Sequence, residues 1–239
     1  MLRGPNALLF GRGGTGGVLN RVTKKAQLDE SFTASQVSAD NLGEVGGQID
    51  TNVVVTETVA FRVNAMVERL ENHRDFYDGE RLGINPTLRI EAGGSRFDLS
   101  YEYIDHQRFI DRGIPTGSNG RPVEAFQDIV FGDADVNTTE LKAHLWRAAV
   151  QHTFSDTLKA NMSAFYGDYD KLYQNFYASS YNQDDSPDVV TLDGYVDTTT
   201  RENTILSGNL VGELEAGGLE HTLLLSLIHI SEPTRPQCI

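Results

Sequence analysis

Five glycines crowd the first part of the chain, and three of them have the spacing of a nucleotide-binding motif. Gly11, Gly13 and Gly16 fit the pattern G-x-G-x-x-G, which in dinucleotide-binding enzymes lies between a buried strand and a helix. The segment that follows, GVLNRVTKKAQLDESF, lacks the apolar stripe at i, i+3, i+4 and i+7 that a packed helix requires. A phosphate loop of the form G-x-x-x-x-G-K-[ST] is also excluded, because Gly17 stands in the lysine position. We therefore interpret these glycines as structural rather than as part of a cofactor site.

The composition narrows the class of protein further. The 239 residues include 20 lysines and arginines against 34 aspartates and glutamates, and the net charge of −14 argues against nucleic acid as a partner. The single cysteine, Cys238, and six histidines that never form a close pair offer neither a disulfide framework nor a zinc site. The acidic stretch NQDDSPDVVTLDGYVD lacks the spacing of an EF-hand, so we interpret it as a solvated loop. We expect no metal site and no cofactor, and the sequence offers no arrangement of residues typical of an enzyme.

Apolar and polar residues alternate with a period of two from about Ser31 onward. This period is typical of β-strands whose two faces meet different environments. No apolar stretch reaches the length of a membrane-spanning helix. The clearest alternating runs are 61–68, 84–91, 97–103, 146–154, 158–164 and 206–214.

Short and long connections between these runs alternate strictly along the chain. The short connections are 56–58, 92–95, 154–157 and 216–219, and the longer polar ones begin at Asp40 and Asn72 or span 111–139 and 179–200. In an antiparallel up-and-down sheet, this alternation collects all short turns at one end and all long loops at the other. Bacterial outer-membrane barrels have this asymmetry. A soluble β-sandwich would explain the alternation as well, but its strands usually run only about five or six residues.

Residues 2–26 resemble a known family. LRGPNALLFGRGGTGGVLNRVTKKA is similar to the end of the plug domain of TonB-dependent outer-membrane receptors, whose pattern reads VLRGP-x-x-x-LYG-x-x-x-x-GG-x-(I/L)N-x-V(S/T)K, with Phe10 here in the usual tyrosine position. The siderophore-receptor branch is suggested by RVNAMVERLENHRDFYDGERLGINPTLRI, DRGIPT and LKANMSAFYGDYDKLYQNFYAS. The resemblance runs from Leu2 to about Leu225.

This resemblance implies an all-β fold: a partial transmembrane antiparallel barrel of about nine strands, out of the roughly 22 of a plugged transporter. We expect residues 1–26 to be the C-terminal end of the plug domain and residues 27–225 to be the first barrel strands. Residues 226–239, SLIHISEPTRPQCI, break the alternation and resemble a translated sequencing adapter, so we expect a non-native tail. A TonB box, a signal peptide, the rest of the plug and the later strands would then lie outside this chain.

The resemblance also implies a function. The intact protein would be a receptor in the bacterial outer membrane that imports ferric siderophores and is energised by the TonB complex. A receptor with the same plug but another cargo, such as cobalamin, a sugar or a peptide, is the alternative. Such a protein is not an enzyme, and its partners would be a ferric siderophore, the TonB energy-coupling complex and outer-membrane lipid.

Candidate ligand contacts follow from position. Phe10 and Arg12 lie where the family places contacts at the plug apex, Arg112, Ile114 and Pro115 belong to the DRGIPT loop, and Tyr177 and Tyr181 end a strand that rises into a long loop. An arginine pairs with an anionic chelate, and aromatic rings stack on its hydrophobic parts. As the alternative, Arg12 bridges to the barrel wall and the two tyrosines belong to the aromatic girdle at the membrane interface.

The alternation also predicts which strand residues meet lipid. We expect one set to point outward and a second set to face the barrel lumen. The outward set is Phe61, Val63, Leu99, Tyr101, Trp146 and Leu206, and the lumenal set is Arg62, Asn64, Glu102 and Ser207.

Overall fold

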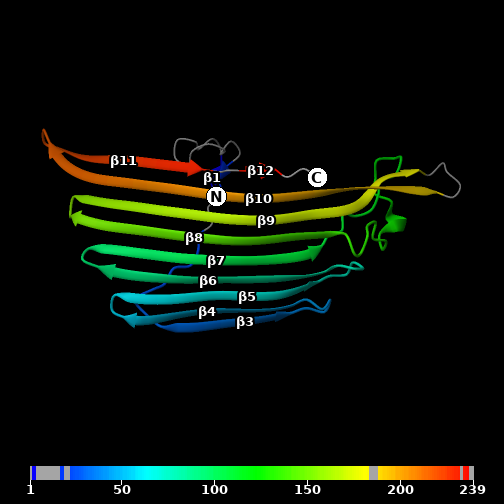
Figure 1. Cartoon of the computed structure of the whole chain (residues 1–239), viewed down its shortest axis with the longest axis horizontal. Helices are drawn as coiled ribbons and strands as arrows, with labels where there is room; N and C mark the ends of the chain where they lie inside the picture. The colour runs from blue at the N-terminus through cyan, green and yellow to red at the C-terminus, as the bar shows by residue number, and fades with distance from the viewer. Residues whose placement is uncertain (1, 4–16, 19–21, 183–187, 232–233, 237–239) are drawn as a thin grey trace.

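A computed structural model describes residues 2–3, 17–18, 22–182, 188–231 and 234–236 of the chain. Nine strands form one antiparallel sheet in which each strand pairs with its neighbours in the sequence (Figure 1). This architecture confirms the predicted all-β fold. The strands are β3 (Phe32–Ala39), β4 (Val45–Thr56), β5 (Val59–Glu71), β6 (Asp78–Ala92), β7 (Ser95–Phe109), β8 (Thr138–Ser155), β9 (Leu158–Asn182), β10 (Val189–Ala216) and β11 (Leu219–Ser231).

Three short strands complete the described part of the chain. β1 (Leu2–Arg3) and β2 (Gly17–Val18) form an antiparallel pair of their own. β12 (Thr234–Pro236) pairs with β10. Among the residues that the structure describes, the single helical element is a 3-10 turn, η1 (Glu124–Phe126). Within the described residues, no helix is both long and apolar enough to cross a membrane.

The connections confirm the predicted asymmetry between the two ends of the sheet. Two-residue turns at 57–58, 93–94, 156–157 and 217–218 all lie at one end, on the left of Figure 1. Gly93, Gly94, Gly217 and Gly218 have positive φ, as tight hairpins joining right-twisted strands require. The longer connections 40–44, 72–77 and 110–137 lie at the other end, where β9 also ends at Asn182 and β10 begins at Val189.

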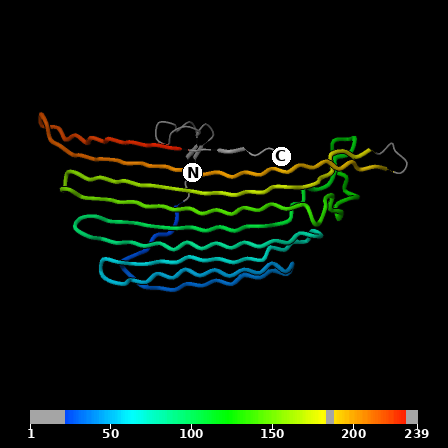
Figure 2. The backbone as a smooth tube through the Cα atoms, viewed as in Figure 1, coloured from blue at the N-terminus to red at the C-terminus, as the bar shows by residue number. Residues whose placement is uncertain are grey.

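The prediction of a loop at residues 179–200 is wrong. Residues 179–200 belong mostly to strands, because β9 continues to Asn182 and β10 already begins at Val189. The two strands pair from Asn182 and Val189 onward, so they extend past their neighbours at the long-loop end (Figure 2). The segment is polar, but it is rich in β-branched valine and threonine, which favour strands even where both faces of a sheet are solvated.

The register confirms the predicted division of the strand residues between the two faces of the sheet. Pairing places Phe61 beside Leu88, Leu88 beside Leu99, and Tyr101 beside Trp146 on one face. Trp146 is 53% exposed there, whereas Arg62, on the opposite face, is only 7% exposed. Because successive residues of a strand point to opposite faces, the remaining predicted positions follow the same division.

The outward face carries an apolar band of membrane dimensions. On β8 the outward side chains run from His144 through Trp146, Ala148 and Val150 to His152. The Tyr101 hydroxyl lies 2.7 Å from Nδ1 of His144, and the Ser95 hydroxyl lies 2.6 Å from Nδ1 of His152. The eight-residue step between the histidines rises about 27 Å along the strand, or roughly 20 Å across a membrane at a barrel tilt near 40°. That is close to the band of about 25 Å in outer-membrane barrels.

β11 is paired along its length but loses the alternation of apolar and polar residues. β11 runs past residue 225 to Ser231 and pairs with β10 over its whole length. Exposed apolar side chains occupy both of its faces, including Leu223, Leu224 and Ile228. The boundaries expected at residues 26 and 225 stay predictions, and Cys238 lies outside the described residues.

Candidate functional site

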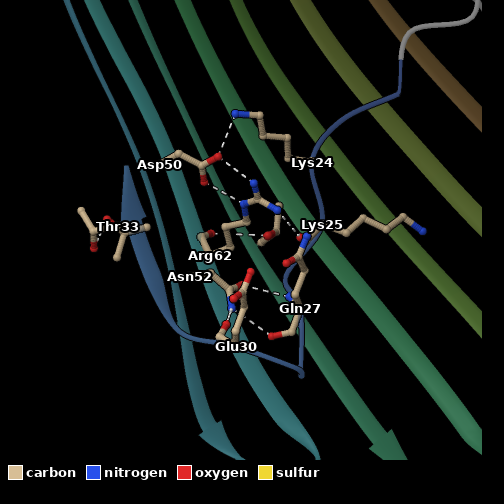
Figure 3. A network of polar contacts seen from close by, with 10 residues as sticks. Lys24, Lys25, Gln27, Glu30, Thr33, Asp50, Asn52 and Arg62 are labelled. Carbon is tan, nitrogen blue, oxygen red and sulfur yellow. Dashed lines mark hydrogen bonds and ion pairs between the residues drawn. The ribbon is translucent and has the colours of Figure 1, made fainter. Parts of the chain in front are cut away.

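The lumenal face of the sheet is crossed by residues 22–31, which we call the anchor segment. Its charges are matched by the wall beneath it (Figure 3). The Arg62 guanidinium donates to both carboxylate oxygens of Asp50, at 2.7 and 2.6 Å, and to the carbonyl of Lys25 at 3.0 Å. Lys24 adds a second cation to Asp50 at 2.8 Å. A bidentate arginine–carboxylate pair of this kind fixes both groups in one geometry.

A buried asparagine fastens the same segment through backbone groups. Asn52 is 1% exposed and donates its amide to the carbonyls of Gln27 and Glu30, while its oxygen accepts from the Gln27 N–H. Further along the wall, Asp98 is shared between Lys25 and Arg89 at 3.0 and 2.8 Å. The charged groups and hydrogen-bond donors in these contacts have partners within the protein. We therefore assign them a structural role, which is to hold the anchor segment to the wall.

A different arrangement occupies the long-loop end of the sheet. Arg112 lies 4.6 Å from the ring centroid of Tyr177 and 5.8 Å from that of Tyr195, and it donates to the Tyr195 hydroxyl at 3.0 Å. Tyr173 stacks on Tyr195 with centroids 5.8 Å apart. We call Arg112, Tyr173, Tyr177 and Tyr195 the mouth cluster. The strand register places its three tyrosines on the lumenal face, like Ser163 and Ser207 further along the same strands.

The electrostatics of the mouth cluster leave a positive charge accessible. The Arg112 side chain is exposed, and its described contacts are two aromatic faces and one phenol. Cation–π contacts of this kind hold a guanidinium in place without neutralising its charge. The cluster therefore presents a fixed cation between apolar ring faces, an arrangement suited to an anionic ligand with flat apolar parts.

A buried amide lies beside the rings. Asn175 stands between Tyr173 and Tyr177 on β9 and pairs with Tyr195 on β10. It is 2% exposed, and neither end of its side-chain amide has a hydrogen-bond partner among the described protein atoms. Leaving such a group unsatisfied costs about 1–3 kcal/mol, and Asn64 on β5 likewise has a buried side-chain nitrogen without a partner among the described residues.

The loop that carries Arg112 is held to β9 by a second buried asparagine. Asn137 is 2% exposed and donates to the carbonyls of Ile110 and Phe176 at 3.0 and 2.9 Å. Its oxygen accepts from the Phe176 N–H at 2.8 Å. Both ends of the β7–β8 loop are thereby fixed next to Tyr177.

The other predicted site residues take different positions. Pro115 is buried and its carbonyl accepts from the Val123 N–H at 3.0 Å, so it shapes the loop, and Ile114 beside it is half-buried. Tyr181 packs edge-on against Phe126 at 5.1 Å and donates to Asp188 at 2.6 Å, and neither of these partners belongs to the mouth cluster. Phe10 and Arg12 lie outside the described residues.

The sequence reasoning missed two members of the cluster. The sequence analysis predicts a loop at residues 179–200, and this prediction leaves Tyr195 outside the sheet and no partner strand opposite Tyr173 and Tyr177. The spacing of Tyr173 and Tyr177, an even number of residues apart, was the available signal that both share a face. Among the residues that the structure describes, no group of three or more histidine, cysteine, aspartate or glutamate side chains is placed to hold a metal ion.

The sheet, its asymmetric ends and its lumenal anchor segment have the architecture of part of a plugged β-barrel. Solved structures share this fold. The closed form of the ferric-catecholate import receptor Fiu from Escherichia coli K12 superposes with a TM-score of 0.85 at 19% identity, over 96% of this chain and 35% of that one. The siderophore receptor PiuA of Acinetobacter baumannii gives 0.84 at 21% identity, over 94% of this chain and 33% of that one.

Curated sequences place the similarity more narrowly. The metal-pseudopaline receptor CntO of Pseudomonas aeruginosa is 26% identical over 95% of this chain and 32% of its own length. The probable TonB-dependent receptor BfrD of Bordetella pertussis is 33% identical over 48% of this chain and 16% of its own length. No family model matches the chain. The resemblance to TonB-dependent receptors is therefore confirmed, and the chain spans about a third of the length of the curated CntO receptor.

Proposed function

We propose that this chain is part of a TonB-dependent receptor that imports ferric siderophores across the bacterial outer membrane. The mouth cluster is the observation that carries the proposal, because it holds an accessible cation between aromatic rings on the lumenal face, at the long-loop end. Outer-membrane barrels direct their long loops outward, so a ligand arriving from outside would meet this cluster first. The names of Fiu and CntO, a catecholate siderophore receptor and a metal-pseudopaline receptor, support a metal chelate as cargo.

We propose a different role for each of the two lumenal regions. The mouth cluster binds the chelate through Arg112 and the tyrosine rings, and the anchor segment connects the plug to the wall that surrounds it. No bond of the cargo needs to be broken for uptake, so no catalytic group is required. The energy would come from the TonB complex acting on the plug.

The proposal is tested by binding measurements on a full-length receptor that contains this chain. A panel of hydroxamate, catecholate and mixed ferric siderophores is titrated by quenching of intrinsic fluorescence. A charge-assisted contact contributes roughly 1.5–3 kcal/mol, so Arg112→Ala should weaken binding about tenfold or more. Tyr177→Ala should weaken it as well, because the ring that positions the guanidinium is lost.

A matched control comes from the opposite end of the sheet. Arg96 pairs with Glu91 at 2.7 Å beside the short turns, so Arg96→Ala should leave the affinity unchanged. Binding of cobalamin, a sugar or a peptide in place of every siderophore would overturn the siderophore assignment in favour of another cargo. Equal affinity of the wild type and both cluster variants would remove the mouth cluster from the site.

A further inference from the structure

Arg74, in the β5–β6 connection, makes three hydrogen bonds to the loop that carries Arg112. Its Nε lies 2.5 Å from a carboxylate oxygen of Asp111. Its two terminal nitrogens donate to the carbonyls of Gln127 and, at 2.9 Å, Ile129. One guanidinium therefore joins both arms of the β7–β8 loop to a neighbouring connection, and all three of its nitrogens are used.

Asp111 in turn restrains the backbone around the next residue, Arg112. The oxygen that is not nearest Arg74 accepts from the Gly113 N–H at 2.8 Å, closing a turn around Arg112. Gly113 has φ of +84°, a conformation that glycine adopts without strain. The backbone of Arg112 is thus fixed on both sides by one carboxylate, which is itself fixed by Arg74.

The ion pair is well sheltered for a loop contact. The side chains of Arg74 and Asp111 are 16% and 12% exposed. Arg112, directly after Asp111, points instead to Tyr177 and Tyr195 on β9 and β10. Three hairpins, β5–β6, β7–β8 and β9–β10, are therefore linked through two consecutive residues.

We propose that Arg74 is a positioning residue for cargo binding, which holds Arg112 in the mouth cluster through Asp111 without touching the cargo itself. The inference rests on the proposed function for its effect on affinity, but the restraint on the loop can be measured without any cargo. Arg74 lies in a different connection from the cluster, so its influence has to pass through Asp111.

A double-mutant cycle in the full-length receptor tests the path. Arg74→Ala should weaken binding of the best ferric siderophore of the panel roughly fivefold, within the usual range for coupled residues of one network. In the Arg112→Ala background, the same change should leave the dissociation constant as it is, because the positioned group is already gone. An equal loss in both backgrounds would overturn the proposal, since Arg74 would then act independently of Arg112.

Two further variants separate positioning from general damage. Arg74→Lys keeps the charge but cannot span three acceptors, so it should restore only part of the affinity. Arg89→Ala breaks an ion pair with Asp98 of nearly identical burial, 17% and 12%, on the wall beneath the anchor segment. It should leave cargo affinity unchanged, and a loss equal to that of Arg74→Ala would contradict the proposal.

A second readout needs no cargo, and it separates failure of this inference from failure of the proposed function. A nitroxide label is attached at Ala125→Cys, an exposed position of the β7–β8 loop, in a Cys238→Ser background. Electron paramagnetic resonance should show a restricted label in the parent and a mobile one in Arg74→Ala. Identical spectra would overturn the positioning role, even if siderophores bind. If no siderophore binds the wild type, the proposed function fails, and a mobile label would still support the restraint on the loop.

Discussion

Two arginines on the lumenal face, Arg62 and Arg112, are held in opposite ways. Arg62 lies on the wall, where both oxygens of Asp50 and the carbonyl of Lys25 take up its donors. Arg112 lies at the long-loop end, where two rings and one hydroxyl hold it. The first charge is neutralised by the protein and the second remains accessible. We interpret the arginine whose donors are all used as a structural contact, and we propose that the accessible arginine held by aromatic rings binds the ligand.

The largest effect is expected from removing the saturated arginine. Arg62→Met leaves the Asp50 carboxylate in a sheltered site with Lys24 as its remaining partner. Breaking a buried pair from one side costs about 3–5 kcal/mol, so the free energy of unfolding should fall by roughly that amount. Guanidinium chloride titration of the full-length receptor in detergent, followed by tryptophan emission, measures it. Cargo affinity should remain that of the wild type.

A double variant sharpens this expectation. Removing both charges, in Arg62→Met with Asp50→Leu, should recover much of the lost stability, because no uncompensated carboxylate remains near the wall. If Arg62→Met alone stays within about 0.5 kcal/mol of the wild type, as an ordinary surface substitution does, the contrast between the two arginines is lost.

Smaller effects should distinguish the two buried asparagines. Asn52 joins the anchor segment to β4, and Asn137 joins the Arg112 loop to β9. Each change to alanine leaves backbone groups unsatisfied, at about 1–3 kcal/mol. Asn52→Ala should expose the anchor segment to protease without changing cargo affinity, and Asn137→Ala should weaken cargo binding several-fold, roughly as expected for coupled neighbours. If Asn52→Ala weakened cargo binding and Asn137→Ala exposed the anchor segment to protease, the proposed difference between the two regions would be contradicted.

Much of the sheet could be predicted from the sequence, because strand alternation and turn chemistry are local properties. Phe61 and Arg62 are neighbours with opposite hydropathy, and they point to opposite faces as the pattern requires. The glycine pairs at 93–94 and 217–218 marked tight turns, and these turns are present. Arg112 and Tyr177 were both predicted as ligand contacts, and the structure brings them together.

The features that the sequence does not predict depend on contacts between segments that lie far apart in the chain. The pair of Arg74 and Asp111 is one choice among 20 basic and 34 acidic residues, and nothing local singles it out. Tyr195 was missed because polar residues around it suggested a loop, although strand pairing with β9 dominates there. Backbone pairing with a long neighbouring strand outweighed local polarity, as tertiary context often does for strands.

The central claim is that the mouth cluster binds the cargo, and a structure of the full-length receptor with a bound ferric siderophore tests it most directly. Electron cryomicroscopy at saturating siderophore should place the chelate against Arg112, with ring contacts to Tyr177 and Tyr195 on the lumenal face. A chelate bound elsewhere, with the hydrogen bond from Arg112 to Tyr195 intact and the mouth cluster empty, would contradict the account.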